Sequence, residues 1–241
     1  MLTRHFDAVS LANNHTGDFG DEAFAEQLEL LQGRLPSFGG GRNRFEARQP
    51  LIIEKNGLRI ALLGYNEFKP PEFEAGENDP GIAWGIDERI KEDIRIARET
   101  HRAGIVLPFM HWGHEYEPHP DDSQRERARA FIDAGATAVI GAHPHVTQDT
   151  EMYRDRPIIY SLGNYVFDGF DAAEAKVGWL LRLTIDANGV AEWDTVVARM
   201  DEQGLPTPDF ETPSPHGRRG SSEIAERPAP QPTAKARDHR P

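Results

Sequence analysis

Three apolar, strand-like runs in this chain end in polar side chains of the kinds that bind metal ions. Functional groups of α/β folds gather at the carboxyl ends of the strands, so three such endings predict one shared site. The runs and their endings are residues 8–12 followed by Asn13, Asn14 and His15, residues 105–110 followed by His111, and residues 138–140 followed by Gly141, His143 and His145.

His143 and His145 are the strongest pair of candidate ligands. Side chains alternate between the two faces of an extended segment, so residues two positions apart point to the same side. Two neutral imidazoles presented in this way suit a transition-metal ion. The alternative is a rigid turn at Pro144 with solvated rings. Because ligation requires several converging ligands, the scattered His101, His216 and His239 are expected to be surface or hydrogen-bonded histidines.

The polar residues around these histidines carry weaker signals. Asparagines after a strand often form turns and helix caps, and Asn13 and Asn14 fit that interpretation. Beside His15, an asparagine oxygen is also a candidate metal ligand next to a general acid. Glu115 is either a ligand-type acid or an exposed loop residue, and Asn164, which again follows a predicted strand, leaves the same choice open.

Helix-like and strand-like patterns alternate along residues 1–204, which predicts an α/β fold with mixed sheets. The pair Asn-Gly between two apolar runs is a strong hairpin signal, and it occurs at Asn56 and at Asn188. Asp87 is expected to cap a helix. The expected helices are 21–34, 87–103 and 121–134, and the expected strands are 6–12, 51–54, 58–64, 105–110, 137–140, 157–162, 177–186 and 190–198.

Residues 205–241 differ in composition from the rest of the chain. They hold eight of the 18 prolines and few apolar residues. Such a segment buries too little surface to offset the entropy of ordering it. We therefore expect one domain over 1–204, followed by a disordered Pro-rich tail over 205–241.

Composition also narrows the function. A net charge of −13 argues against a nucleic-acid-binding surface, and the absence of cysteine excludes disulfides and thiolate zinc sites. No run approaches the roughly 20 apolar residues of a membrane span, and the N-terminus lacks a signal-peptide core, so the chain as written is expected to be soluble and, by default, cytoplasmic. Neither a phosphate-binding glycine loop nor a Gly-x-Ser-x-Gly elbow is present, which favours metal-assisted hydrolysis.

Four blocks of residues resemble the CapA-type poly-γ-glutamate capsule-biosynthesis proteins (PGA_cap), a family of the calcineurin-like metallophosphoesterase superfamily. The resemblance extends over about residues 5–200, with the blocks in the family's order. It implies a sandwich of two mixed sheets flanked by helices, holding two divalent metal ions (Mn, Fe or Zn). The blocks are 12–15, 111–116 with Pro120 and Gln124, 143–148, and 160–168.

The resemblance also implies roles for individual residues. Asn14, His111, His143 and His145 match metal ligands of the superfamily, and His15 matches its catalytic histidine. Three further residues lie in or beside the family motifs without an assignable role, and we expect them to contact the substrate or the ligands: Asn13, Glu115 and Asn164.

One departure from the family pattern concerns the acidic ligands. The family carries a Gly-Asp strand end and an Asn-Leu-Glu segment upstream of the block at Asn14, whereas only a dozen residues precede that block here. We therefore expect a chain that lacks the first strands and half of the metal site. Met1 is then an internal position of a longer protein, whose upstream part could hold a membrane anchor or an export signal. The alternative is a degenerate homologue with at most one intact metal position.

Two functions follow from the resemblance. The first is a metal-dependent hydrolase of a small molecule or of polyglutamate, in which His15 acts as general acid or as an electrostatic stabiliser. The second is a non-catalytic polymer-binding or accessory subunit of capsule synthesis, or an inactive fragment. A strongly acidic surface should repel a polyanion unless a metal or the local arginines Arg42, Arg44 and Arg48 offset it.

Overall fold

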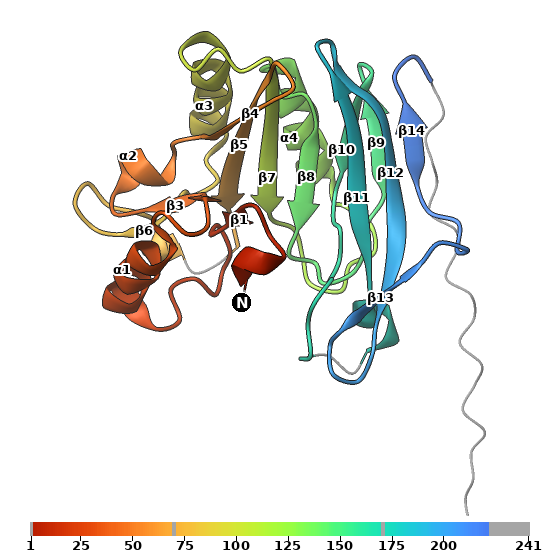
Figure 1. Ribbon diagram of the computed structural model, residues 1–241, viewed down its shortest axis with the longest axis horizontal. Coiled ribbons are helices and arrows are strands. Elements are labelled where there is room, and N and C mark those ends of the chain that lie inside the picture. The colour runs from red at the N-terminus through yellow and green to blue at the C-terminus, as the bar shows by residue number, and fades with distance from the viewer. Residues whose placement is uncertain (1, 69–70, 170–171, 222–241) are drawn as a thin grey trace, which may run out of the picture.

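A six-stranded sheet forms the centre of the fold (Figure 1). The computed structural model describes residues 2–68, 71–169 and 172–221. The middle of the sheet is parallel, because β5, β7, β8 and β10 run in one direction, and both edge strands are antiparallel to their neighbours. The strands are, in spatial order, β4 (Leu51–Lys55), β5 (Leu58–Asn66), β7 (Ile105–His111), β8 (Val139–Ala142), β10 (Arg156–Ile159) and β9 (Thr150–Tyr153).

Both edges of this sheet are hairpins, and only one had a sequence signal. Between β4 and β5, Asn56 and Gly57 have φ of 52° and 77°, as expected for a tight turn at an Asn-Gly pair. Between β9 and β10, Arg154 and Asp155 adopt φ of 51° and 59°. Residues with a Cβ rarely adopt this conformation, so the sequence did not predict the second hairpin or the strand β9.

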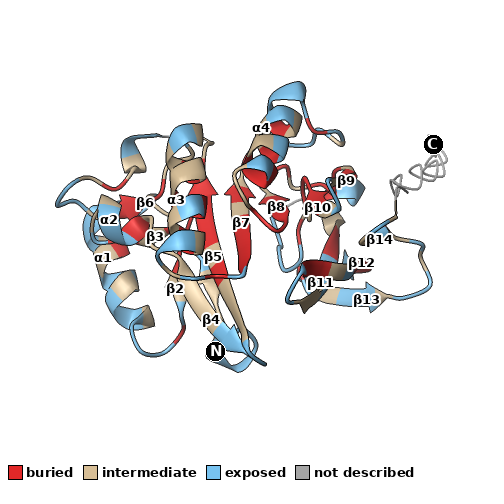
Figure 2. Ribbon diagram, turned by 90° about the horizontal axis from the view of Figure 1, so that it is seen from above, coloured by how far each residue is buried: buried red, intermediate tan, exposed pale blue. Residues whose placement is uncertain are grey.

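Two helices cover one face of the sheet, α3 (Asp87–Glu99) and α4 (Asp122–Asp133). Buried residues of both helices and of the central strands form one core, visible in Figure 2. Asp121 caps α4 as a capping box with Gln124. The expected cap at Asp87 is wrong: Ile86 is the N-cap residue of α3, no side chain caps this helix, and Asp87 lies in its first turn.

A second, four-stranded sheet covers the other face and forms a second core around Trp179 and Trp193. Two mixed sheets were expected. In the described part of the chain every pairing within this second sheet is antiparallel, so of the two sheets only the first, six-stranded one is mixed. The disordered tail was expected to begin at residue 205, which is wrong, because two strands of this sheet lie beyond residue 204. Residues 222–241, the rest of the expected tail, are outside the described residues. The strands are β11 (Val177–Asp186), β12 (Gly189–Met200), β13 (Pro206–Asp209) and β14 (His216–Arg218).

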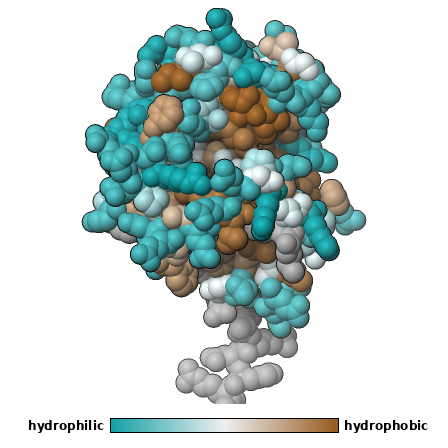
Figure 3. Space-filling view, turned by 60° about the vertical axis from the view of Figure 1, so that its left-hand side comes forward, coloured by the Kyte–Doolittle hydropathy of each residue, from teal (hydrophilic) through white to brown (hydrophobic). Residues whose placement is uncertain are grey.

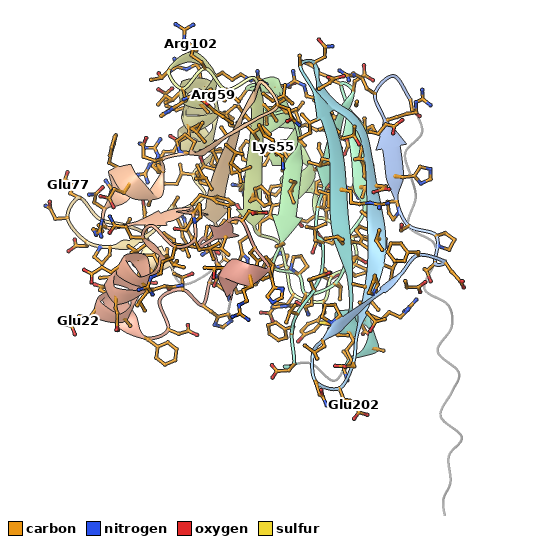
Figure 4. The ribbon with its side chains drawn as sticks, viewed as in Figure 1. Glu22, Lys55, Arg59, Glu77, Arg102 and Glu202 are labelled. Atoms are coloured by element: carbon orange, nitrogen blue, oxygen red, sulfur yellow. The ribbon has the colours of Figure 1, made fainter. Side chains whose placement is uncertain are left out.

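The N-terminal region packs beside β5 at one end of the layers (Figure 1). The strand expected over 6–12 is shorter than predicted, because only Val9 and Ser10 pair with a neighbouring strand. This side of the molecule is mostly hydrophilic (Figure 3), and charged side chains such as Glu22 and Glu77 project outward from it (Figure 4). Its elements are β1 (Val9–Ser10), α1 (Gly20–Leu31), β2 (Ser37–Phe38), β3 (Gly40–Gly41), α2 (Arg44–Ala47) and β6 (Gly81–Ile82). The remaining elements of the described chain are the 3-10 turns η1 (Leu2–Arg4), η2 (Pro71–Phe73) and η3 (Ala173–Lys176).

Candidate metal centre

The carboxyl ends of β5, β7 and β8 meet at one edge of the central sheet, the lower edge in Figure 1. Asn66 at the end of β5 pairs in register with His111 at the end of β7, and His111 pairs with Ala142 of β8. The segment that leaves β8 then carries His143 and His145. The parallel order of these strands therefore brings together side chains that are far apart in the sequence.

His143 is buried without satisfied polar atoms. The residue is only 3% exposed, and neither nitrogen of its ring has a hydrogen-bond partner among the described residues. Burial, followed by the neighbouring charge of His145, lowers the pKa of His143 to about 4. The ring is therefore neutral at physiological pH. A buried polar group without a partner is costly, and a neutral imidazole with a free lone pair is a metal ligand.

Asn164 orients the imidazole of His145. Its amide nitrogen donates to the carbonyl oxygen of Ala175 at 2.9 Å, which turns its Oδ1 toward His145. That oxygen lies 2.8 Å from Nδ1 of His145, so Nδ1 is the protonated nitrogen. The lone pair is then on Nε2. A hydrogen bond that fixes the tautomer of a histidine is a common support for metal ligation.

Glu115 completes a group of three candidate ligands. One ligand atom from each of Glu115, His143 and His145 lies within 4.8 Å of the others. Two imidazole nitrogens and one carboxylate oxygen are a donor set that suits Zn, Mn or Fe. The side chains present thus fit a divalent transition-metal ion.

A second pair lies beside this group. Nε2 of His111 is 2.8 Å from Oδ1 of Asn14, and the rings of His111 and His143 have centroids 4.7 Å apart. Burial, followed by the charge of His143, lowers the pKa of His111 to about 3. His111 is therefore also neutral. The two residues named by the sequence, 97 positions apart, come together as expected.

His15 and Asn13 lie at the rim of the site. The side chain of His15 is 69% exposed, and its Nδ1 is 2.9 Å from Oδ2 of Asp18. Oδ1 of Asn13 accepts a hydrogen bond from the backbone N–H of His15 at 2.8 Å. Asn13 thus forms a local turn, which was one of its two interpretations.

Comparison with known proteins identifies the family. The profile of the family described as bacterial capsule synthesis protein PGA_cap matches residues 1–169. The chain belongs to the PGA_cap family. It is 38% identical over 166 residues to the PGA biosynthesis protein CapA of Bacillus subtilis, covering 68% of this chain and 43% of that protein. It is 32% identical over 207 residues to the capsule biosynthesis protein CapA of Bacillus anthracis, covering 84% of this chain and 50% of that protein.

The chain therefore spans about half the length of these PGA_cap relatives. Among solved structures, the sulfate thiohydrolase SoxB of Thermus thermophilus superposes with a TM-score of 0.50 at 18% identity, covering 84% of this chain and 34% of that one. The metallophosphoesterase type of fold expected from the resemblance is thus confirmed. No helix in the described part of the chain has both the length and the apolar character needed to cross a bilayer.

Two aromatic rings flank the histidines of this PGA_cap chain, and neither was predicted as a site residue. The ring of Phe68 lies 3.9 Å from that of His143, and the ring of Phe167 lies 5.4 Å from that of His145, centroid to centroid. Asn66, fully buried, donates from its amide to the carbonyl oxygen of Phe68 at 2.8 Å and so holds the first ring in place. Asn66 follows an apolar run as His111 does, so the signal used for the other residues would have found it.

The arginines considered as a polyanion contact are engaged elsewhere. Arg48 donates two hydrogen bonds to the carboxylate of Asp93, at 2.6 and 2.9 Å. Arg44 faces the carboxylate of Glu74 at 3.6 Å, and Arg42 donates to the side chain of Gln32 at 3.1 Å. These three side chains therefore do not form a free basic patch in this member of the PGA_cap family.

Proposed function

We propose that this chain binds a divalent metal ion through His143, His145 and Glu115, and that the site serves a hydrolytic step in capsule synthesis. The observation that carries the proposal is His143, whose ring is buried with both nitrogens unpartnered among the described residues. Such a group is costly in a metal-free protein, and metal ligation would satisfy the ring nitrogen that carries the lone pair.

The residues of the site have distinct parts in this proposal. A bound metal ion would supply Lewis-acid chemistry and an activated water molecule. Asn164 fixes the tautomer of His145, which keeps the Nε2 lone pair available. Phe68 and Phe167 cover the histidine rings and reduce the access of water, which strengthens electrostatic interactions in the site.

The neighbouring residues extend the same proposal. Asn14 and His111 lie beside His143 and would provide ligands of a second metal position. His15 stands at the exposed rim, where a general acid can reach a leaving group, and Asp18 orients its ring.

The substrate class we propose is a γ-linked glutamate polymer or a smaller compound related to it. Support comes from the relatives, which are named for PGA and capsule biosynthesis. The net charge of −13 opposes approach of a polyanion, and a divalent metal ion at the site is the element that would offset this repulsion.

Metal titration tests the proposal. The wild-type chain, stripped with EDTA, is titrated calorimetrically with Mn²⁺ and Zn²⁺ and assayed on phosphodiesters and γ-glutamyl oligomers. We expect binding by the wild type and its loss in His143→Ala. His101→Ala is the matched control, since His101 precedes β7 at the opposite end from His111. Binding without turnover would favour the accessory, polymer-binding function, and no binding of either ion would refute the metal site.

A further inference from the structure

Two glutamines are buried beneath the loop that carries Glu115. Gln148 is fully buried, and Gln124, on α4, is 3% exposed. Long polar side chains are seldom buried this far, and when they are, their amides are hydrogen-bonded. The partners of these two amides therefore indicate what they hold in place.

The two amides form a directed chain of hydrogen bonds that ends on the Glu115 loop. Oε1 of Gln124 accepts from the backbone N–H of Asp121 at 3.1 Å, so its Nε2 points away from the helix. This Nε2 donates to Oε1 of Gln148 at 3.2 Å. Nε2 of Gln148 then donates to the carbonyl oxygen of Glu117 at 3.0 Å.

A fourth hydrogen bond fixes the other side of the loop. The backbone N–H of Tyr116 donates to the carbonyl oxygen of Pro144, which lies between the two histidines, at 2.8 Å. Glu115 is thus followed directly by two residues that are bonded to the segment 144–148. The carboxylate and the imidazoles are positioned by one connected structure.

The loop has a shape that needs such support. Gly113 and Tyr116 have φ of 84° and 63°, and tyrosine rarely adopts this conformation unless its surroundings impose it. A Cβ at Gly113 would lie 2.7 Å from Nε2 of Gln124, so the loop rests directly on the first amide. Glu115 itself is exposed and has no burial to restrict it.

We propose that Gln124 and Gln148 are positioning residues that hold Glu115 as the third ligand of the metal bound by His143 and His145. This inference rests on the metal site proposed above. Holding the carboxylate in place before the metal arrives reduces the entropy lost on binding, so the relay increases metal affinity without touching the ion.

A double-mutant cycle on Mn²⁺ affinity tests the relay without any activity assay. Gln148→Met keeps the length of the side chain and removes both hydrogen bonds, and Glu115→Ala removes the ligand. We expect each change to raise the Kd for Mn²⁺ roughly tenfold. The double variant should bind about as weakly as Glu115→Ala alone, because the relay has no effect once the ligand is gone.

Two further variants separate positioning from general damage. Gln124→Met breaks the relay one step earlier and should weaken Mn²⁺ binding in the same direction, which also covers the case that Gln148→Met folds poorly. Tyr65→Phe removes another buried hydrogen bond, the one from Tyr65 to Asp93 at 2.9 Å, and should leave the Kd unchanged.

Three results would overturn the relay while leaving the metal site intact. They are an unchanged Kd in both glutamine variants, additive losses in the double variant, and an equal loss in Tyr65→Phe. A wild-type chain that binds neither Mn²⁺ nor Zn²⁺ would instead refute the proposed metal site, and the relay with it.

Discussion

Replacing His143 by leucine should stabilise the metal-free protein while it abolishes metal binding. The histidine is 3% exposed and both of its ring nitrogens lack a partner among the described residues. Leucine has a similar volume and no polar atom to satisfy. Both side chains are unbranched at Cβ, so the strain of a φ of 101° at this position is common to the two proteins.

The size of the gain follows from two opposing contributions. An unsatisfied buried polar group costs about 1–3 kcal/mol, which the substitution removes. Imperfect packing of leucine against Phe68 and His111, which lie next to the ring, costs up to about 1.5 kcal/mol. Taken at the middle of both ranges, the net gain is about 1 kcal/mol, which corresponds to a rise in Tm of roughly 2–4 °C for a chain of this length.

Added metal should reverse the order of the two proteins. At a free metal concentration of about 100 times Kd, the wild type gains about 2.7 kcal/mol from ligation, and the variant gains nothing at this site. Thermal or urea unfolding in EDTA and in excess Mn²⁺ measures both values. We expect His143→Leu to be the more stable protein in EDTA and the less stable one in Mn²⁺.

His145→Leu is the matched comparison. Its Nδ1 is paired with Oδ1 of Asn164 at 2.8 Å, so the substitution leaves a partner unsatisfied and should lower stability in both conditions. A His143→Leu protein that is less stable than the wild type in EDTA would refute the reasoning. The nitrogens of His143 would then be satisfied without a metal, and the central argument for the site would lose its basis.

Two further predictions concern acid stability and the approach of β8 to β10. Because burial lowers the pKa of His143 to about 4 and of His111 to about 3, against 6.5 when exposed, the unfolded chain binds more protons between these values. The metal-free protein should lose stability as the pH falls from about 7 to 4, less steeply in His143→Leu; equal slopes in urea titrations would contradict this. Gly141→Ala places a Cβ 1.9 Å from the carbonyl oxygen of Tyr160 and should cost about 1–3 kcal/mol or more in unfolding free energy. Gly104→Ala, where a Cβ meets nothing within 4 Å, is the control and should be close to neutral by the same measurement.

Local signals predicted the elements that depend on neighbouring residues. The Asn56-Gly57 turn was found as expected, since it depends on residues within a few positions. The helix that begins after Asp121 was also predicted, although its capping box was not. The strand β13 (Pro206–Asp209) was missed, because its prolines are typical of a tail and its order comes from pairing with β12.

The residues of the candidate site likewise fall into those that local sequence patterns predicted and those that they did not. The sequence predicted the histidines at the strand ends, because a glycine and an apolar run mark where β8 stops. It left Glu115 and Asn164 without roles, because both are brought near His145 by the packing of distant segments, which no local pattern contains. The supporting glutamines had no signal beyond their place in a family motif.

The sequence by itself determined the α/β class, the family, and which residues of ligand type stand at the ends of the strands. These properties follow from short-range periodicity and from motifs that can be recognised in the sequence whatever the tertiary contacts around them. The tertiary structure alone decided that His143 is buried without partners, that Asn14 meets His111 across 97 positions, and that Gln148 reaches the loop of Glu115. Burial and ligand convergence depend on which distant segments pack together, and a linear pattern does not contain that information.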